Sequence, residues 1–456
     1  MANATEQWSS KLGFIYATAG SAIGLGAIWK FPYIAGQSGG GAFFLVFLLL
    51  TLFLGVPLLI GEYILGRHSG KDAILTYKTL APRSPFQVTG WLGVVCCFLI
   101  LSFYSVIGGW SLLYLGSSVS GQLSNLSLNE SQDYFGRLIA NPGLALGAQL
   151  FFILLTALVV AKGVQKGIEQ VSKWMIPSLL VLLVILAAYS LTLDGAAEGI
   201  QYLLAPDFSA VDGETILFAL GQSFFALSVG VSVMVTFSSY ASKQQNLPAS
   251  AMTLAIMNVF VALLAGLVIF PGVFTFGFQP DEGPALIFAV LPAIFEQIAF
   301  GQILLIAFFV LFLFAALSTA FSLLEIIVAA FVRGNQDKRK QASWIFGFLI
   351  FLVGIPSTLS YGVLDDFFIG DRSFFDAVDY LTSNVLMPLG ALLICLFIPR
   401  KINKDILMQE FQSGSNAGKK LFVLWYALVK YVVPFAIVIV FIDQLFGLNL
   451  ITLIFE

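Results

Sequence analysis

The chain contains 456 residues, with 25 acidic and 22 basic side chains, and 59% of its residues are apolar while only 10% are charged. Because an ordinary soluble domain carries about 25% charged residues, this composition excludes a soluble protein and indicates one that lies in a membrane. Its apolar runs are long and uninterrupted rather than alternating, which excludes a β-barrel and leaves a bundle of helices.

The predicted elements are helices that can cross about 30 Å of hydrocarbon, which takes about 20 residues each. In chain order they cover 10–34, 41–66, 88–120, 144–163, 168–192, 214–240, 247–277, 302–332, 342–361, 373–398 and 421–446. We therefore expect an all-α polytopic membrane protein with eleven transmembrane helices. The loops between the spans are too short for a separate soluble domain, so 1–456 is predicted to be a single transmembrane domain.

Basic residues gather in alternate loops. The loops after the second, fourth, sixth, eighth and tenth spans contain clusters such as 338–340 and 400–404, whereas the opposite side holds Lys30, Arg137 and Arg372. Because Lys and Arg near span ends favour the cytoplasmic side, we expect a protein of the cell (plasma or inner) membrane with a cytoplasmic amino terminus. With eleven spans the carboxyl terminus is then extracellular.

The first and sixth spans are interrupted midway by small residues, in 19–27 (AGSAIGLGA) and 221–232 (GQSFFALSVGVS). Glycine permits unwinding there, and the backbone groups set free at mid-depth are costly unless they bind something. Close packing of small residues between helices is the alternative reading of either stretch alone. Two breaks five spans apart favour two repeats, at about 10–192 and 214–398, with 421–446 as an additional helix.

Short motifs surround these breaks along most of the chain. They are Trp8, Gly20 to Gly26 with Phe31 and Pro32, 39–43 (GGGAF), Gly55 to Pro57 with Glu62, Tyr104 with Trp110, 166–169 (KGIE), 221–228, and Ser318 with Thr319. Together they resemble the neurotransmitter:sodium symporter family, especially its bacterial LeuT/MhsT-like hydrophobic amino acid transporters. The resemblance implies a LeuT-like fold with a 5+5 inverted repeat and broken helices 1 and 6. It also implies a sodium-coupled symporter that imports neutral, hydrophobic L-amino acids by alternating access.

The resemblance assigns the substrate site to the two breaks. The amides of Leu25 and Gly26 and the hydroxyl of Tyr104 would receive the substrate carboxylate, which agrees with the preference of helix amino termini for anions. Gly24 leaves room for that carboxylate, and apolar side chains would surround the substrate side chain. The full predicted site is Ser21, Ala22, Gly24, Leu25, Gly26, Ile100, Tyr104, Phe225, Ala226, Ser228, Val231, Thr319 and Leu323.

One sodium site follows from the same resemblance and a second is weakened. The first would use oxygen atoms of Gly20, Ile23, Ala315, Ser318 and Thr319. At the second site Ala27 and Ala226 stand where the family has Asn and Thr, which leaves carbonyls of Ala22 and Ala226, the side chain of Asn258 and the substrate carboxylate. We therefore expect at least one sodium ion. Phe47 and Ala262 replace hydroxyl ligands of chloride-dependent members, so chloride dependence is not expected.

The resemblance also points to gates and to a hinge. Lys30 and Asp379 would form the outer charged pair above Tyr104 and Phe225, and Trp8 and Tyr240 would close the inner side. The inner charged pair of the family is altered to Thr5 and Arg333, so we considered a pair of Glu6 with Arg333. Gly167 and Pro177 predict a hinge in the fifth span.

Several alternatives stay open. Glu325 is an acid within a predicted span, where ionisable groups are functional candidates, so coupling to protons, or to one sodium ion alone, is the alternative mode of transport. An amino-acid-binding membrane sensor is a more distant one. The single histidine, His68, and the three cysteines have no metal-ligand spacing, so an enzyme is not expected. The expected partners are an amino acid and the bilayer, without nucleic acid; the preferred amino acid and the oligomeric state are left open.

Overall fold

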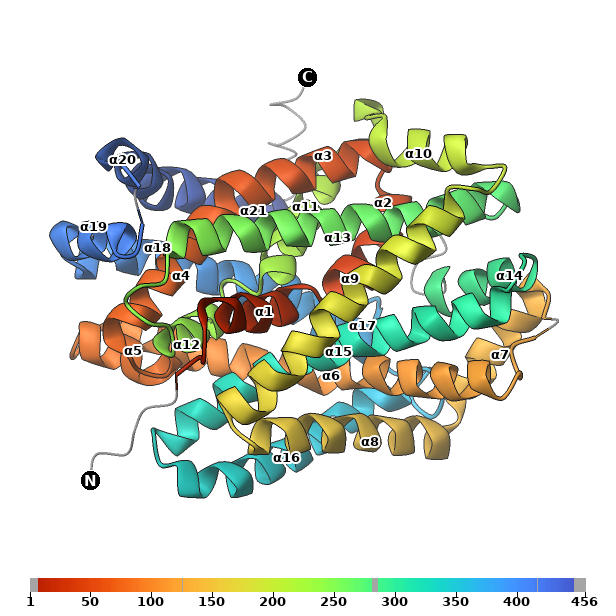
Figure 1. The fold of residues 1–456 in the computed structure, drawn as a ribbon, viewed down its shortest axis with the longest axis horizontal. Helices are drawn as coiled ribbons and strands as arrows, with labels where there is room; N and C mark the ends of the chain where they lie inside the picture. Colours follow the sequence, from red (N-terminus) through yellow and green to blue (C-terminus); the bar gives the residue numbers. More distant parts are fainter. Residues whose placement is uncertain (1–6, 125, 281–285, 416, 447–456) are drawn as a thin grey trace.

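The structure is a computed structural model that describes residues 7–124, 126–280, 286–415 and 417–446. Most of these residues lie in helices. Most of the helices run roughly along the long axis of the molecule (Figure 1). The first part of the chain forms α1 (Lys11–Ala22), the π-helical turn η1 (Gly26–Lys30), α2 (Phe31–Gln37), α3 (Gly41–Leu50), η2 (Thr51–Gly55), α4 (Val56–Ser69), α5 (Ala73–Leu80), η3 (Pro85–Gln87), α6 (Val88–Val119), α7 (Leu128–Ala140), α8 (Pro142–Ala161), η4 (Val164–Glu169), α9 (Gln170–Ser190), α10 (Ala196–Leu204) and η5 (Phe208–Ala210).

The second part repeats this pattern of long helices joined by short ones. It comprises α11 (Gly213–Leu227), α12 (Val233–Ser239), α13 (Leu247–Thr275), η6 (Leu286–Val290), α14 (Leu291–Glu296), α15 (Gly301–Val332), η7 (Gln336–Lys338), α16 (Arg339–Leu359), α17 (Phe374–Tyr380), η8 (Leu381–Leu386), α18 (Met387–Lys401), α19 (Lys404–Gln412), α20 (Lys419–Ala427), η9 (Leu428–Val432) and α21 (Val433–Phe446). A two-stranded antiparallel hairpin, β1 (Phe368–Ile369) and β2 (Arg372–Ser373), precedes α17.

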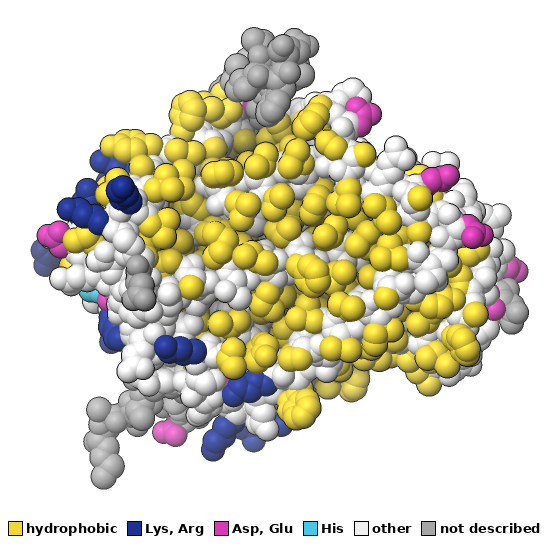
Figure 2. Space-filling view, turned by 45° about the horizontal axis from the view of Figure 1, so that its top comes forward, with side chains coloured by type: hydrophobic (Ala, Val, Ile, Leu, Met, Phe, Trp, Pro, Cys, Tyr) yellow, Lys and Arg dark blue, Asp and Glu magenta, His cyan; other side chains and the backbone are white. Residues whose placement is uncertain are grey.

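Nine helices of the described residues are long and apolar enough to cross a membrane, and a tenth span results if the bent pair of α1 with η1 and α2 is counted as one. The predicted span at 214–240 is divided into α11 and α12, which are too short to pass that test singly. The predicted count of eleven therefore stays a prediction. Figure 2 shows a broad surface of hydrophobic side chains, with Lys and Arg gathered at the end that carries α5 and α19.

Both predicted breaks exist, and they lie in the middle of the bundle. α1 ends at Ala22 and the next helical segment, starting at Gly26, is inclined by 47° to it. α11 ends at Leu227, and α12 starts only at Val233. α1 packs against α15, α9 and α13, while α12 packs against α4. The two breaks are thus enclosed by long, regular helices.

Local sequence explains where several helices begin. The side chain of Ser10 accepts a hydrogen bond from the amide of Gly13 and caps α1, and Asn246 does the same for the amide of Ala249 at the start of α13. Such caps satisfy amides that lack a partner within the helix.

Candidate functional site

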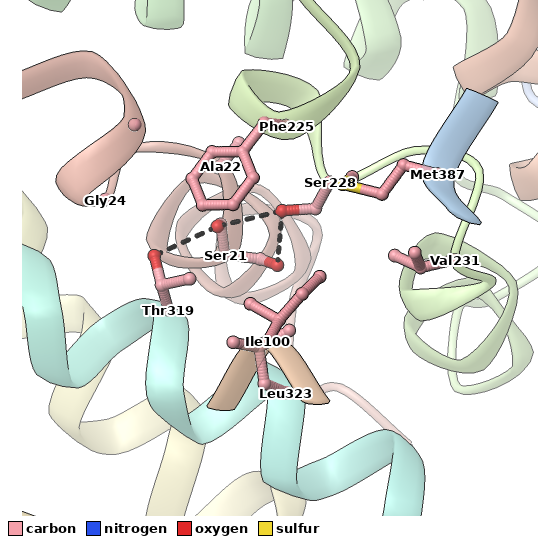
Figure 3. Close-up of a pocket in the computed structure, with 11 residues that line it drawn as sticks. Ser21, Ala22, Gly24, Ile100, Phe225, Ser228, Val231, Thr319, Leu323 and Met387 are labelled. Carbon is pink, nitrogen blue, oxygen red and sulfur yellow. Dashed lines mark hydrogen bonds between the residues drawn. The ribbon is translucent and has the colours of Figure 1, made fainter. Parts of the chain in front are cut away.

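A buried cavity of about 20 Å³ lies where the two breaks face each other (Figure 3). It has room for about one water molecule, so the surrounding side chains would have to move apart to admit an amino acid. Ile100 and Leu323 lie on the side of the cavity opposite Phe225 (Figure 3). The lining residues are Ser21, Ala22, Gly24, Gly26, Ile100, Phe225, Ser228, Val231, Thr319, Leu323 and Met387. All of them except Met387 belong to the site predicted from the sequence.

The predicted residues Leu25, Tyr104 and Ala226 do not line the cavity but lie beside it. The amide of Leu25 donates to the hydroxyl of Tyr104 at 3.3 Å. This contact holds the Tyr104 hydroxyl at the start of the second half of the broken first span, where backbone amides favour an anion. The two groups predicted to receive a carboxylate are thus adjacent.

Gly24 and Gly26, in the first break, lie so close to neighbouring side chains that a Cβ atom does not fit at either position. A Cβ atom on Gly24 would lie 2.0 Å from Thr319 Oγ1 and 3.0 Å from the Tyr104 hydroxyl. One on Gly26 would lie 2.7 Å from a ring carbon of Phe225. Any larger residue at position 24 would therefore displace side chains of the site itself.

The second break is held open by hydrogen bonds to other helices. Ser228, Gly230 and Ser232 all have positive φ angles, which is the left-handed conformation that interrupts a helix. The Ser228 hydroxyl donates to the carbonyl of Ser21 at 3.0 Å, joining the two breaks. The amide of Gly230 donates to the buried carboxylate of Glu62 at 2.6 Å. Glu62 therefore acts as an acceptor that stabilises the break.

The predicted first sodium site brings together oxygen atoms from α1 and α15. The Thr319 hydroxyl lies 3.3 Å from the carbonyl of Gly20 and 3.1 Å from that of Ser21, and the Ser318 hydroxyl donates to the carbonyl of Ala315 at 3.0 Å. Hydroxyl and carbonyl oxygens are the ligands that hard cations prefer. The residues present therefore fit a sodium ion between the two helices.

The predicted second sodium site has a different composition. The side-chain amide of Asn258 donates to the carbonyls of Ala22 and Ala226 at 2.9 and 2.8 Å. The side chains of Ala27 and Ala226 are buried methyl groups and contribute no oxygen atom. The predicted residues are brought together, but with a nitrogen rather than an oxygen atom facing both carbonyls.

Lys30 and Asp379, the predicted outer pair, form a partly buried ion pair above the cavity. Lys30 Nζ lies 2.7 and 2.8 Å from the two carboxylate oxygens of Asp379 and 3.2 Å from the hydroxyl of Ser383. The same amine lies 5.2 Å from the ring centre of Phe225. The pair therefore covers the aromatic ring that borders the cavity.

The inner side is closed by Trp8 and Tyr240, whose ring centres lie 6.0 Å apart. Trp8 Nε1 donates to the carbonyl of Phe237 at 2.8 Å, and the hydroxyl of Tyr240 donates to Glu325 at 3.0 Å. Glu325 is also ion-paired with Arg339, and both side chains are buried. The sequence identified Glu325 as a candidate but not Arg339, whose proximity depends on how α15 and α16 pack.

The altered inner pair is described only in part. Thr5 and Glu6 lie outside the described residues. Arg333 caps the end of α15 and lines a separate cavity of about 140 Å³ with Asp72, Tyr240 and Arg339. The hypothesis of a pair of Glu6 with Arg333 stays untested.

The predicted hinge segment is distorted. Residues Val164–Glu169, which include Gly167, form a π-helical turn, and Pro177 lies inside α9. Glu169 accepts hydrogen bonds from the amide and hydroxyl of Ser9, just before α1. The irregular segment is thus attached to the start of the first broken span.

Within the described residues there is no group of three or more His, Cys, Asp or Glu side chains that could hold a metal ion. The three cysteines are free and buried.

Comparisons with known proteins agree with this geometry. A model of the "Sodium:neurotransmitter symporter family" matches residues 5–134 and 135–453. The chain is 59% identical to the sodium-dependent transporter YhdH of Bacillus subtilis (strain 168), over 96% of the chain and 97% of that protein. It is 34% identical to a sodium-dependent transporter of Haemophilus influenzae, over 97% of the chain and 98% of that protein. The crystal structure of MhsT in complex with L-phenylalanine superposes with a TM-score of 0.91 at 44% identity, covering 96% of this chain and 99% of MhsT.

Proposed function

The chain belongs to the sodium:neurotransmitter symporter family, and from this premise we propose that it imports neutral, hydrophobic L-amino acids by alternating access, coupled to sodium. Members of this family are transporters rather than enzymes, and the fold is the LeuT-like fold of MhsT. Sodium dependence is shared with its relatives. The substrate class and the residues that bind it are the part that we propose.

The observation that carries the substrate class is the lining of the central cavity. The end of the cavity that would hold the substrate side chain is lined by Ile100, Val231, Leu323 and Met387. No charged side chain is among the lining residues. A charged substrate side chain would be buried there without a partner, which costs several kcal/mol. The complex of MhsT with L-phenylalanine supports an apolar amino acid as the substrate.

The two breaks supply the polar contacts that an amino acid needs. The substrate carboxylate would bind the amides of Leu25 and Gly26 and the hydroxyl of Tyr104, replacing the present contact between Leu25 and Tyr104. The amino group would face the carbonyl oxygens near Ala22, Ala226 and Ser228. A sodium ion bound by Gly20, Ile23, Ala315, Ser318 and Thr319 would hold α1 against α15.

Access would alternate between the two gates described above. Opening the outer side requires Lys30 to leave Asp379, and opening the inner side requires Tyr240 to leave Glu325. Because Glu325 is ion-paired with Arg339, its charge already has a partner, which argues against proton coupling through this acid. Phe47 and Ala262 are fully buried and offer no chloride ligand.

The orientation in the membrane is proposed from charge. Lys and Arg side chains gather at the end of the molecule with α5 and α19 (Figure 2), and this end would face the cytoplasm of the cell. The amino terminus is then cytoplasmic and the carboxyl terminus extracellular. The amino acid substrate and the lipid bilayer are the expected partners.

The proposal is tested by thermal stabilisation of the purified protein with each of the twenty amino acids, in sodium chloride and in potassium chloride. A ligand stabilises the folded state in proportion to the logarithm of its concentration above Kd. We expect leucine, phenylalanine, tryptophan or similar apolar amino acids to raise Tm only with sodium. Stabilisation by Lys, Asp or Glu instead would contradict the proposed substrate class.

A further inference from the structure

Asn258 joins three elements at the centre of the protein. It lies on α13, is fully buried, and its Nδ2 atom donates one hydrogen bond to the carbonyl of Ala22 and one to that of Ala226. These carbonyls belong to the ends of α1 and α11, where the two spans break. One side chain thus supplies a hydrogen-bond partner to one carbonyl of each break. Leaving these carbonyls without a partner would be costly at this depth.

The orientation of this amide is set by its partners. Nδ2 has two carbonyl acceptors, whereas Oδ1 has no hydrogen-bond partner among the described residues. Turning the amide over would lose both bonds and bring Oδ1 against two carbonyl oxygens. The nitrogen therefore faces the carbonyls.

The nitrogen occupies the position that a cation would need. A hard cation such as Ca²⁺ lies at about 2.3–2.6 Å from its oxygen ligands and takes six to eight of them, and sodium is of similar radius. An ion bound to the carbonyls of Ala22 and Ala226 would have to displace Nδ2, which lies 2.9 and 2.8 Å from them. Because the amide hydrogens point at these two oxygens, an ion bound between them would require the amide to move away or turn over.

The surrounding side chains do not offer enough oxygen atoms to favour the ion. Ala27 and Ala226 are buried methyl groups. With the amide reversed, the residues predicted for this site would supply three oxygens, from Ala22, Ala226 and Asn258, and even with a substrate carboxylate added the set stays below the six to eight oxygens that a hard cation takes. The residues present do not fit a sodium ion at the second site.

We propose that Asn258 takes the place of the second sodium ion, so that the protein binds one sodium ion, at the site formed by Gly20, Ile23, Ala315, Ser318 and Thr319. The two amide hydrogens carry partial positive charge toward the carbonyls of both breaks, as an ion would. This inference rests on the proposed function, because it concerns the number of ions that drive transport. It also implies that the substrate carboxylate is bound by amides and Tyr104 without a sodium ion beside it.

The test is the stoichiometry of ²²Na⁺ binding to the purified full-length protein, measured by equilibrium dialysis without an amino acid and again with saturating L-phenylalanine. We expect one ion per chain in both conditions, and none in the Ser318→Ala/Thr319→Ala variant. Two ions per chain in either condition would overturn the inference and leave sodium-coupled transport intact. Binding of no ion would contradict the proposed sodium coupling itself.

A gain of binding provides a second test. The Ala27→Asn/Ala226→Thr variant restores two side-chain oxygens and frees Asn258 to turn its Oδ1 toward an ion, so the stoichiometry should rise from one to two. The Ala27→Leu/Ala226→Val variant matches its side-chain volumes without adding oxygen and should stay at one. If the folded oxygen-bearing variant, checked by size-exclusion chromatography, also stayed at one, the explanation by missing oxygens would be wrong. If either variant fails to fold, the number of ions bound by the wild-type protein still decides between one and two sodium sites.

Discussion

Tyr240 at the end of α12 donates a hydrogen bond of 3.0 Å to Glu325 on α15. This contact links the second half of a broken span to one of the long helices that surround it. Glu325 is in turn ion-paired with Arg339 on α16. α12 is therefore tied to a charged pair within its surroundings, and in the proposed transport cycle this contact breaks when the inner side opens.

Replacing Tyr240 by Phe should favour the inward-open state. A hydrogen bond to a charged group contributes about 1.5–3 kcal/mol, so the equilibrium should shift by about tenfold or more. Hydrogen–deuterium exchange of peptides that cover Val233–Ser239 should become faster. Tyr134→Phe, which removes the contact with Ser117 on the opposite side of the protein, should leave this exchange unchanged, and equal exchange in both variants would count against the inner gate.

Glu325→Gln should have a different effect from Tyr240→Phe. The glutamine can still accept from Tyr240, but the buried Arg339 loses its charge partner. Removing one partner of a buried ion pair costs about 3–5 kcal/mol, so Tm should fall further than in Tyr240→Phe, which loses a hydrogen bond of about 1.5–3 kcal/mol. Equal losses of Tm in the two variants would show that the ion pair with Arg339 is not the main contribution of Glu325 to the stability of the folded protein.

Asp379→Asn should reduce uptake about tenfold by leaving the Lys30 amine buried without its carboxylate. Lys30 would retain the hydroxyl of Ser383 and the ring of Phe225, neither of which carries a negative charge. Uptake by Lys30→Gln, Asp379→Asn and the double variant, combined in a mutant cycle, should give a coupling of about 0.5–3 kcal/mol. Strictly additive effects would mean that the two residues do not act as one gate.

Gly24→Ala should abolish substrate binding or weaken it more than tenfold. The added methyl group would lie 2.0 Å from Thr319 Oγ1, and Thr319 lines the cavity and belongs to the predicted sodium site. The matched control is Gly147→Ala on α8, where an added Cβ atom meets nothing within 4 Å. This substitution should leave substrate binding unchanged and stabilise the helix by up to about 1 kcal/mol. Wild-type affinity in Gly24→Ala would remove Gly24 from the site.

A pH dependence is expected at α19, whose Glu410 contacts Arg67, Lys243 and His68. Burial raises the pKa of Glu410, but the hydrogen bonds and charges of Lys243 and Arg67 outweigh it and hold this pKa below its usual value. A carboxylate with a lowered pKa in the folded state stabilises the structure above its unfolded pKa, and this contribution disappears as the pH falls through the folded pKa.

Hydrogen–deuterium exchange of Lys404–Gln412, corrected for intrinsic rates, measures this effect. Protection should be constant above about pH 5 and decline below about pH 4.5. Glu410→Gln should lose this decline and be less protected at neutral pH, while Asp405→Asn on the same helix should behave as the wild type. An unchanged pH profile in Glu410→Gln would exclude Glu410 as the titrating group.

The sequence was sufficient for the fold class and for most of the cavity. Small residues at 19–27 and 221–232 located both breaks, because glycine permits unwinding, as at Gly230 with its positive φ angle; the positive φ angles of Ser228 and Ser232 could not be predicted from their residue type. The motifs then identified ten of the residues that line the cavity. The exact number of spans was not settled, because the sixth is divided into two short helices.

Contacts between distant helices could not be read from the sequence. Met387 enters the cavity beside Val231 because of the direction in which α18 starts, which periodicity does not give. The pair of Glu325 with Arg339 and the amide of Asn258 between two carbonyls likewise depend on helix packing. For the pair of Glu325 with Arg339, the sequence offered one indication, namely an acid within one span and an arginine at the start of the next.

Sodium-driven accumulation of an apolar amino acid is the central claim, and uptake into proteoliposomes tests it most directly. Radiolabelled leucine and tryptophan would be supplied with an imposed sodium gradient, an imposed proton gradient, or neither, with Ser318→Ala/Thr319→Ala as the site variant and Ser111→Ala, whose buried hydroxyl bonds its own helix, as the control. We predict accumulation with the sodium gradient alone, lost in the site variant and retained in the control. Accumulation driven by protons without sodium would contradict the account.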